Sequence, residues 1–228
     1  MADYANRIFF YVIISNSQTK KDNMIKTIIF DLGGVLIDIE FSKTTEKFKK
    51  LIEAQKKEIP SIGEIWEINR NYEVGDFDDA MFRSLYQLHL GFSIPDEIFD
   101  DAWNALLRNF NLAGFNLIKK LKPKYQICLL SNTNRIHYNH CDNRLKEENI
   151  SNGFSELFNP IFLSYELKMK KPDKPIYTYV VDTLGVNPEE ILFIDDLKAN
   201  IETAKEIGIN TIHLTDNKVI EELVLSYL

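Results

Sequence analysis

The sequence lacks the features that mark several common protein classes. Its 228 residues include two cysteines, Cys128 in an apolar stretch and Cys141 in a polar one, so we expect no structural disulfide and a reducing cytoplasm as the compartment. Lysine and arginine form no long run, and the net charge is −7 with an isoelectric point near 5.2. An acidic chain without a basic patch is not suited to binding nucleic acid. With 45% hydrophobic residues, it can bury a full core, as one domain with an insertion or as two small domains.

A membrane-spanning apolar run is also missing from the N-terminal segment. The apolar stretch at residues 8–14 follows Arg7 and is too short to cross a bilayer. No small-residue cleavage site of a signal peptide follows it. We therefore expect no membrane partner, and we interpret residues 1–23 either as a misassigned start ahead of Met24 or as an extra strand.

The most informative feature that is present lies at residues 27–38. Four residues, 27–30, lead directly into Asp31, which is followed closely by Gly33 and Gly34. An apolar run that ends at an acid and two glycines predicts a buried strand that carries Asp31 into a site. An ordinary tight turn begins in the same way, so this feature needs support from elsewhere in the chain.

A second buried strand is predicted at residues 191–195, and it ends in the adjacent acids Asp195 and Asp196. Adjacent carboxylates repel each other and need a counter-charge. Oxygen-only clusters of this kind suit Mg²⁺, which is usually held by one or two carboxylates together with water and substrate phosphate. Asp196 also suits the N-cap of a following helix.

Two further elements lie between these acidic strand ends. The apolar run 126–131 ends at Ser131, where a hydroxyl and free backbone N–H groups of a following helix form a seat for phosphate. Lys171 precedes Pro172, which restricts the backbone of the lysine, and the lysine side chain supplies a cation for a phosphate group. Taken singly, Ser131 also suits a helix cap and Lys171 a solvated surface charge. The order Asp, Ser, Lys-Pro, Asp-Asp argues against coincidence.

With these four elements in this order, the chain from about residue 25 to 212 resembles the haloacid dehalogenase (HAD) superfamily of phosphatases and related hydrolases. Segments 30–35, 131–135 and 171–173 are most similar to the branch that contains the phosphatase domain of soluble epoxide hydrolase and the bacterial alpha-D-glucose-1-phosphate phosphatase. One departure concerns Gly33. Most phosphatases of the superfamily carry a second Asp at this position as general acid and base.

The resemblance implies three catalytic residues. Asp31 would attack phosphorus to form an aspartyl-phosphate, while Ser131 and Lys171 would hold the transferred oxygens. Residues following the Ser motif would bind the substrate: Asn132, Thr133, Asn134 and Arg135.

The resemblance also implies a Mg²⁺ site. Its ligands would be the Asp31 carboxylate, the Gly33 carbonyl and the Asp196 carboxylate. Asp195 would belong to the same metal site and, with Asn200, orient metal-bound waters or Lys171.

Periodicity predicts an α/β fold. Short apolar strands are expected at residues 25–30, 126–131, 161–164, 191–195 and 211–214. Helices are expected between them, including 175–184 and 198–207, the latter closed by Gly208. This alternation predicts a doubly wound parallel sheet, the HAD-like Rossmannoid core, whose ligands bind outside the carboxyl ends of the strands.

Residues 41–113 break the alternation, because they contain no good strand and carry apolar residues at helical spacing. We expect a helical cap at 41–113 and the α/β core at 1–40 and 114–228. In the resembled superfamily such a cap closes over the site and selects the substrate. Five residues could face the cleft or pack within the cap: Trp66, Asn69, Arg70, Tyr72 and Glu73. The run 137–141 contains His and Cys but no second ligand pair, so we expect a polar helix and not a zinc site.

The sequence therefore predicts a cytoplasmic, Mg²⁺-dependent phosphatase of a small phosphorylated metabolite, with no obligate protein partner evident. A hexose 1-phosphate is the favoured substrate, because an anomeric oxygen leaves more easily without the acid missing at Gly33. The main alternative is a catalytically silent binding or regulatory protein. A haloacid dehalogenase, acting without metal, would leave the three acids Asp31, Asp195 and Asp196 uncompensated. A receiver domain would carry its acidic pair first in the chain.

Overall fold

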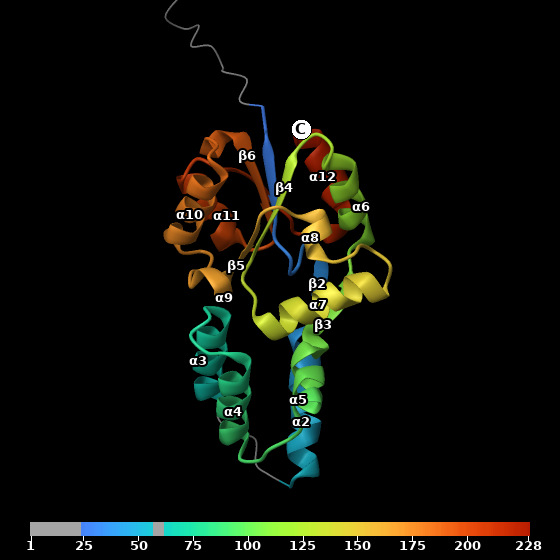
Figure 1. Ribbon diagram of the computed structural model, residues 1–228, viewed down its shortest axis with the longest axis vertical. Coiled ribbons are helices and arrows are strands. Elements are labelled where there is room, and N and C mark those ends of the chain that lie inside the picture. The colour runs from blue at the N-terminus through green and yellow to red at the C-terminus, as the bar shows by residue number, and fades with distance from the viewer. Residues whose placement is uncertain (1–23, 57–61) are drawn as a thin grey trace, which may run out of the picture.

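The computed structural model describes residues 24–56 and 62–228 (Figure 1). The segment 1–23, interpreted above as a misassigned start or an extra strand, lies outside the described residues. The strands are β1 (Thr27–Phe30), β2 (Ile37–Ile39), β3 (Leu107–Phe110), β4 (Gln126–Ser131), β5 (Ile161–Leu163), β6 (Ile191–Asp195) and β7 (Asn210–His213).

The helices occupy most of the remaining described chain. Nine have eight or more residues: α2 (Phe41–Ala54), α3 (Ile62–Glu73), α4 (Asp79–Leu90), α5 (Asp96–Trp103), α6 (Leu112–Leu121), α7 (Arg135–Glu147), α10 (Lys174–Leu184), α11 (Lys198–Glu206) and α12 (Ile220–Tyr227). The short ones are α8 (Phe154–Leu157), α9 (Ser164–Leu167), η1 (Asn104–Leu106), η2 (Pro188–Glu190) and η3 (Asn217–Val219). Within the described ranges, none is long and apolar enough to cross a membrane.

A five-stranded sheet in the order β5-β4-β1-β6-β7 forms the core, and every neighbouring pair is parallel. The register places Phe30 of β1 opposite Leu129 of β4 and Ile194 of β6. The carboxyl ends of these three strands therefore meet at one edge of the sheet. The expected doubly wound α/β fold is confirmed, and all five predicted strands are present.

Alternation along β1 explains why both faces of the sheet are covered. Ile28 and Phe30 pack into the hydrophobic cluster on one face, whereas Ile29 packs into the cluster on the other. Successive side chains of a strand point to opposite faces. Helices α6 and α12 cover one side of the sheet, and α10 and α11 cover the other (Figure 1). At the end of α11, Gly208 adopts a φ of 95°, as expected for its predicted role in closing that helix.

A second, two-stranded sheet corrects one expectation. No strand was expected within residues 41–113, yet β3 pairs antiparallel with β2. The sequence of β3 is short and has two exposed polar residues between Leu107 and Phe110. It therefore forms a strand because it pairs with β2, and not because of a local apolar pattern. The two strands form a stem that joins helices α2 to α5, the helical segment, to the core.

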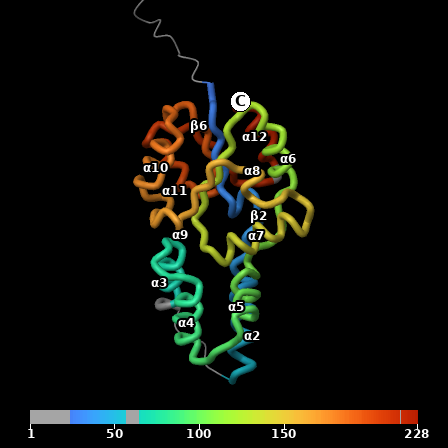
Figure 2. Tube along the Cα trace, in the orientation of Figure 1, coloured from blue at the N-terminus to red at the C-terminus, as the bar shows by residue number. Residues whose placement is uncertain are grey.

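Helices α2, α3, α4 and α5 lie beyond the carboxyl edge of the parallel sheet, at one end of the molecule (Figures 1 and 2). They share an aromatic core that includes Phe48, Tyr72, Phe82, Phe99 and Trp103. The Tyr72 and Phe82 rings are stacked with centroids 4.0 Å apart. Stacked and edge-to-face rings of this kind stabilise a small bundle beyond the area that they bury. The proposed cap limits of 41 and 113 stay a prediction.

Candidate active site

A buried ion cluster lies where β1, β4 and β6 end. Asp31 extends β1 by one residue, because its N–H donates to the Ile194 carbonyl at 2.9 Å. Lys171 Nζ lies 2.8 Å from Asp31 Oδ1 and 2.7 Å from Asp195 Oδ2. It also donates to the Leu130 carbonyl at 3.0 Å. One ammonium group thus links the ends of all three strands.

Asp195 is fully buried, and protein donors engage both of its oxygens. Oδ1 accepts the Leu197 N–H at 2.8 Å, and Asn200 Nδ2 lies 2.9 Å from Oδ1 and 3.0 Å from Oδ2. Oδ2 also accepts from Lys171. A buried carboxylate is tolerated only when it is paired and hydrogen-bonded. Asp195 is therefore held rigidly and in turn holds Lys171.

Asp196 differs from its neighbour because its carboxylate is half-buried and packs against a glycine. Gly34 has a φ of 73°, and a Cβ atom there would lie 2.3 Å from Asp196 Oδ2. Gly34 therefore supplies both a left-handed turn and the space for this carboxylate. Its role did not follow from the sequence, although the second glycine after Asp31 was the available signal.

The three carboxylates fit a divalent cation. Asp31, Asp195 and Asp196 each offer an oxygen, and these oxygens lie within 4.8 Å of one another. No other group of three His, Cys, Asp or Glu side chains in residues 24–56 and 62–228 is arranged in this way, which includes the His and Cys of 137–141. Lys171 contacts two of the three acids, so negative charge remains in excess. Hard oxygen ligands with excess negative charge suit Mg²⁺.

The pKa shifts of these residues reflect the same excess of negative charge. Burial raises the pKa of Asp31 to about 7; Lys171 opposes this shift and Asp195 adds to it. Burial and the neighbouring Asp195 also raise the pKa of Asp196. Burial lowers the pKa of Lys171, but the two carboxylates in contact with it outweigh that effect and raise its pKa overall. Lys171 is therefore held in its charged form, whereas Asp31 and Asp196 have too little positive charge nearby to balance their ionised forms.

The residues at and after the end of β4 lie next to Lys171 of this cluster. Ser131 is buried at the end of the strand. The Asn132 side chain binds the backbone of Lys171 from both sides: Oδ1 accepts its N–H at 2.9 Å and Nδ2 donates to its carbonyl at 2.8 Å. Asn132 therefore fixes the position of the lysine, a role that depends on tertiary contact and that sequence reasoning missed.

The next three residues have different surroundings. The Thr133 N–H donates to Ser164 Oγ at 2.9 Å. Asn134 caps α7, where its Oδ1 accepts the His137 N–H at 3.0 Å. Arg135 is exposed, and its guanidinium lies over the Tyr165 ring at 5.5 Å from the centroid. Arg135, one of the four expected substrate-binding residues, lines a cavity.

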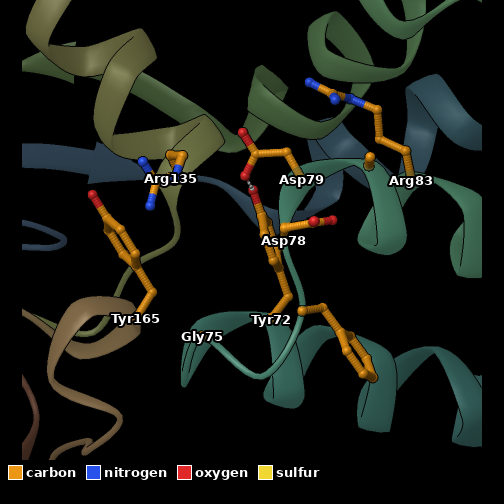
Figure 3. A pocket seen from close by; sticks show the side chains of 9 residues that line it. Tyr72, Gly75, Asp78, Asp79, Arg83, Arg135 and Tyr165 are labelled. Atoms are coloured by element: carbon orange, nitrogen blue, oxygen red, sulfur yellow. Dashed lines mark hydrogen bonds between the residues drawn. The ribbon is translucent and has the colours of Figure 1, made fainter.

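That cavity, of about 440 Å³, lies between the helical segment and the core (Figure 3). Arg135 and Tyr165 line it from the core, facing Tyr72 and Asp79 of the helical segment. Its other lining residues are Gly75, Phe77, Asp78, Ala80 and Arg83. The Tyr72 hydroxyl donates to Asp79 Oδ1 at 2.7 Å. Volume and polar lining are both suited to a small polar ligand.

The five residues of the segment 41–113 that were expected to face the cleft or pack within the cap lie in different environments. Tyr72 lines the cavity, whereas the Trp66 side chain is 64% exposed and Arg70 lies near its ring. Asn69 and Glu73 are half-buried. Tyr165 and Asp79 were not anticipated, because no sequence motif connects them with the site.

Comparisons with known proteins agree with this geometry. The family model described as haloacid dehalogenase-like hydrolase matches residues 25–208. D-ribitol-5-phosphate phosphatase of Bacteroides thetaiotaomicron is 30% identical over 189 residues, covering 82% of this chain and 91% of the relative. Rat bifunctional epoxide hydrolase 2 is 31% identical over 135 residues, covering 55% of this chain and 23% of the rat protein.

A solved structure is also similar. It is a HAD family enzyme of Bacteroides thetaiotaomicron in complex with magnesium and inorganic phosphate, with 34% identity and a TM-score of 0.74. The match covers 82% of this chain and 93% of that one. The expected resemblance, including its epoxide hydrolase branch, is confirmed.

Proposed function

The chain belongs to the haloacid dehalogenase-like hydrolase family, and on that premise we propose that it is a magnesium-dependent phosphomonoester hydrolase of a small phosphorylated sugar or sugar alcohol. The observation that carries this proposal is the buried cluster of Asp31, Lys171 and Asp195, with Asp196 beside it, at the carboxyl edge of the parallel sheet. Ligands of doubly wound folds bind at that edge.

Asp31 is the nucleophile in the proposed reaction. One of its oxygens attacks phosphorus, the bond from phosphorus to the leaving oxygen breaks, and an aspartyl-phosphate forms. Lys171, 2.8 Å from Asp31, orients the carboxylate and offers its charge to the transferred oxygens. Ser131 and the Asn132 N–H hold the remaining oxygens. Attack of water on phosphorus then releases phosphate and restores Asp31.

The proposed ligands of Mg²⁺ are the Asp31 carboxylate, the Gly33 carbonyl and the Asp196 carboxylate. Asp195 belongs to the same site, where it positions Lys171 through its 2.7 Å contact. When bound, the ion supplies positive charge that draws the phosphoryl group to Asp31 and offsets the excess of acids. The magnesium in the similar Bacteroides structure supports this assignment.

The cavity beside Arg135 accommodates the organic part of the substrate. Its lining offers the Tyr72 hydroxyl, the Asp79 carboxylate and the Arg135 guanidinium, which together donate to and accept from hydroxyl groups. A sugar or sugar alcohol carries many such hydroxyls, and the relative that acts on D-ribitol 5-phosphate supports this class. Within the class we propose hexose 1-phosphates as substrates, because Gly33 leaves the motif that carries Asp31 without an acid, and an anomeric oxygen depends less than a primary oxygen on a proton donor from another element.

The test is a screen of sugar and sugar-alcohol phosphates with the purified protein, with and without a chelator. We expect phosphate release that requires Mg²⁺ and is lost in Asp31→Asn. The variant replaces the attacking carboxylate with an amide of the same shape. Binding of Mg²⁺ and inorganic phosphate without release from any ester would contradict the proposal and favour the catalytically silent binding protein.

A further inference from the structure

Because residue 33 is Gly, the motif that carries Asp31 contains no acid that could protonate the leaving oxygen. Asp38 is a nearby acid in sequence, but it is exposed and accepts a hydrogen bond from Asn217 Nδ2 at 2.7 Å. Asp195 has both oxygens engaged by protein donors. A donor for this chain must therefore come from another element.

We propose that Glu73, the last residue of α3, is the general acid and base of the phosphatase reaction. This inference rests on the proposed function and assigns the proton transfers of that same site to a residue of the helical segment.

The end of α3 is docked on the core at three points. The Tyr72 hydroxyl accepts the Ile136 N–H at 3.3 Å. The carbonyl of Glu73 accepts from Ser164 Oγ at 2.7 Å. A Cβ atom on Gly75 would lie 2.0 Å from the Tyr165 carbonyl oxygen, so only glycine allows this approach. The turn that carries Glu73 is thus pressed against the segments that follow β4 and β5.

Ser164 connects Glu73 with the proposed phosphate seat. Its fully buried hydroxyl accepts the Thr133 N–H at 2.9 Å and lies 3.0 Å from the Thr133 carbonyl. Thr133 belongs to the loop that begins at Ser131. One hydroxyl group therefore separates the backbone of Glu73 from that loop.

The lysine segment also affects Glu73. Lys170, the immediate neighbour of Lys171 in sequence, is close enough for its charge to counter the rise in pKa that burial gives the Glu73 carboxyl. Glu73 thus has neighbours from both segments that supply phosphate-binding groups, the loop after Ser131 and the lysine segment.

The environment of Glu73 also favours a carboxyl that can hold a proton. Burial raises its pKa, and the nearby Lys170 opposes the shift. A general acid works best when its pKa lies near the working pH. By contrast, Glu67 on the same helix is exposed to solvent.

The proton transfers balance over the two steps. As an Asp31 oxygen bonds to phosphorus, the bond to the leaving oxygen breaks and its electron pair stays on that oxygen, which takes the proton of the Glu73 carboxyl and departs as a neutral alcohol. The Glu73 carboxylate then takes a proton from the water molecule that attacks the aspartyl-phosphate. Phosphate leaves, and both Asp31 and the protonated Glu73 are restored.

The test compares leaving groups in Glu73→Gln, which keeps the shape of the side chain but cannot transfer a proton. We expect kcat/KM for primary esters such as D-ribitol 5-phosphate to fall by about 10² to 10⁴. The loss should be smaller for glucose 1-phosphate and smallest for p-nitrophenyl phosphate, whose leaving group needs no acid. With the aryl ester, a burst of nitrophenol should precede slow turnover, because water attack lacks its base.

Glu67→Gln, the same change on the same helix, should leave all three rates unchanged. Glu73→Asp retains an acid, so it should recover part of the rate with the primary ester. An equal loss for all three esters in a folded Glu73→Gln protein, or no loss, would overturn the assignment of Glu73. If the unmodified protein releases phosphate from none of the esters, the proposed function itself is wrong.

Discussion

The edge of the parallel sheet and the junction between the helical segment and the core are built on different principles. At the edge, Asp31 and Asp195 are buried, both contact the buried Lys171, and the register of β1, β4 and β6 fixes their positions. At the junction, Tyr72 and Arg135 face each other across a cavity from segments far apart in the sequence. The attack on phosphorus thus depends on a rigid frame, whereas substrate selection and the proton transfers proposed for Glu73 depend on how two units dock.

The same difference sets the size of the expected effects. Charges at the edge lie in a low-dielectric interior, where loss of one partner leaves another charge uncompensated. Polar groups at the junction are partly accessible to water, which replaces a lost contact in part. Apart from Glu73, for which a proton transfer is proposed, substitutions at the edge should therefore cost far more than substitutions at the junction.

The largest effect is expected for Lys171→Met. This change leaves Asp31 and Asp195 buried without a cation, which should destabilise the fold by about 3 to 5 kcal/mol. It should also lower kcat by about 10² to 10³ or more, because a preorganised donor is lost. Urea unfolding and phosphate release measure the two effects. Lys168→Met, a change at an exposed neighbour, is the control; if Lys171→Met were as mild as Lys168→Met, the buried charge of Lys171 would contribute to neither stability nor catalysis.

The second comparison separates the two adjacent acids. Asp196→Asn should raise the Mg²⁺ concentration needed for activity by at least about 100-fold with little change in stability, because its carboxylate is half-buried beside Gly34. Asp195→Asn should lower stability, since it disturbs the pairing with Lys171 and Asn200. Magnesium titrations of activity and thermal unfolding distinguish the two variants. Activity that is equal with and without a chelator would contradict the metal assignment.

Much of the sheet edge could be predicted because its signals are local. Asp31, Ser131 and Asp195 each terminate an apolar run, and the structure ends β1, β4 and β6 at or next to them. A buried strand needs only a few consecutive apolar residues to be recognised. The order of these strand ends along the chain carried the family assignment.

The remaining features depend on contacts that a local pattern does not encode. β3 became visible only through its pairing with β2. Asn132 was expected only as a substrate-binding residue, and no local pattern indicates that its side chain also binds the backbone of Lys171, 39 positions away. The contacts of Tyr165 with the cavity depend on the docking of the helical segment, so no spacing rule could have identified it.

Gly34 offers a sharper test of the rigid edge. Gly34→Ala would place a Cβ atom 2.3 Å from Asp196 Oδ2 at a φ of 73°, so the carboxylate must move. A misplacement of about 1 Å in a catalytic site can cost about 10²-fold in rate. Gly91→Ala is the matched control, because Gly91 has nearly the same φ, 75°, but no atom lies within 4 Å of the Cβ that the change adds. Equal activity of both variants would show that Asp196 tolerates displacement.

At the junction, Arg135→Gln should act on binding alone. The guanidinium stacks on Tyr165 and lines the cavity, but it is exposed. We expect KM for a sugar phosphate to rise about tenfold, as for loss of one hydrogen bond to a charged group, with kcat unchanged. Steady-state kinetics with sugar phosphates and p-nitrophenyl phosphate measure this. A large fall in kcat would move Arg135 into the catalytic cluster.

The smallest effect is expected for Tyr72→Phe, which removes a hydroxyl that donates to Asp79 at 2.7 Å and accepts the Ile136 N–H at 3.3 Å. The aromatic ring and its stacking on Phe82 are retained, so the fold should lose only about 1 kcal/mol. KM should rise a few-fold, because the Asp79 carboxylate is no longer oriented toward the ligand. Tyr86→Phe, in the same aromatic cluster, is the control for stability. If Tyr72→Phe reduced kcat as much as Lys171→Met, the docking of the helical segment would govern the attack by Asp31 as well as the proton transfers, and the edge and the junction would function as one site.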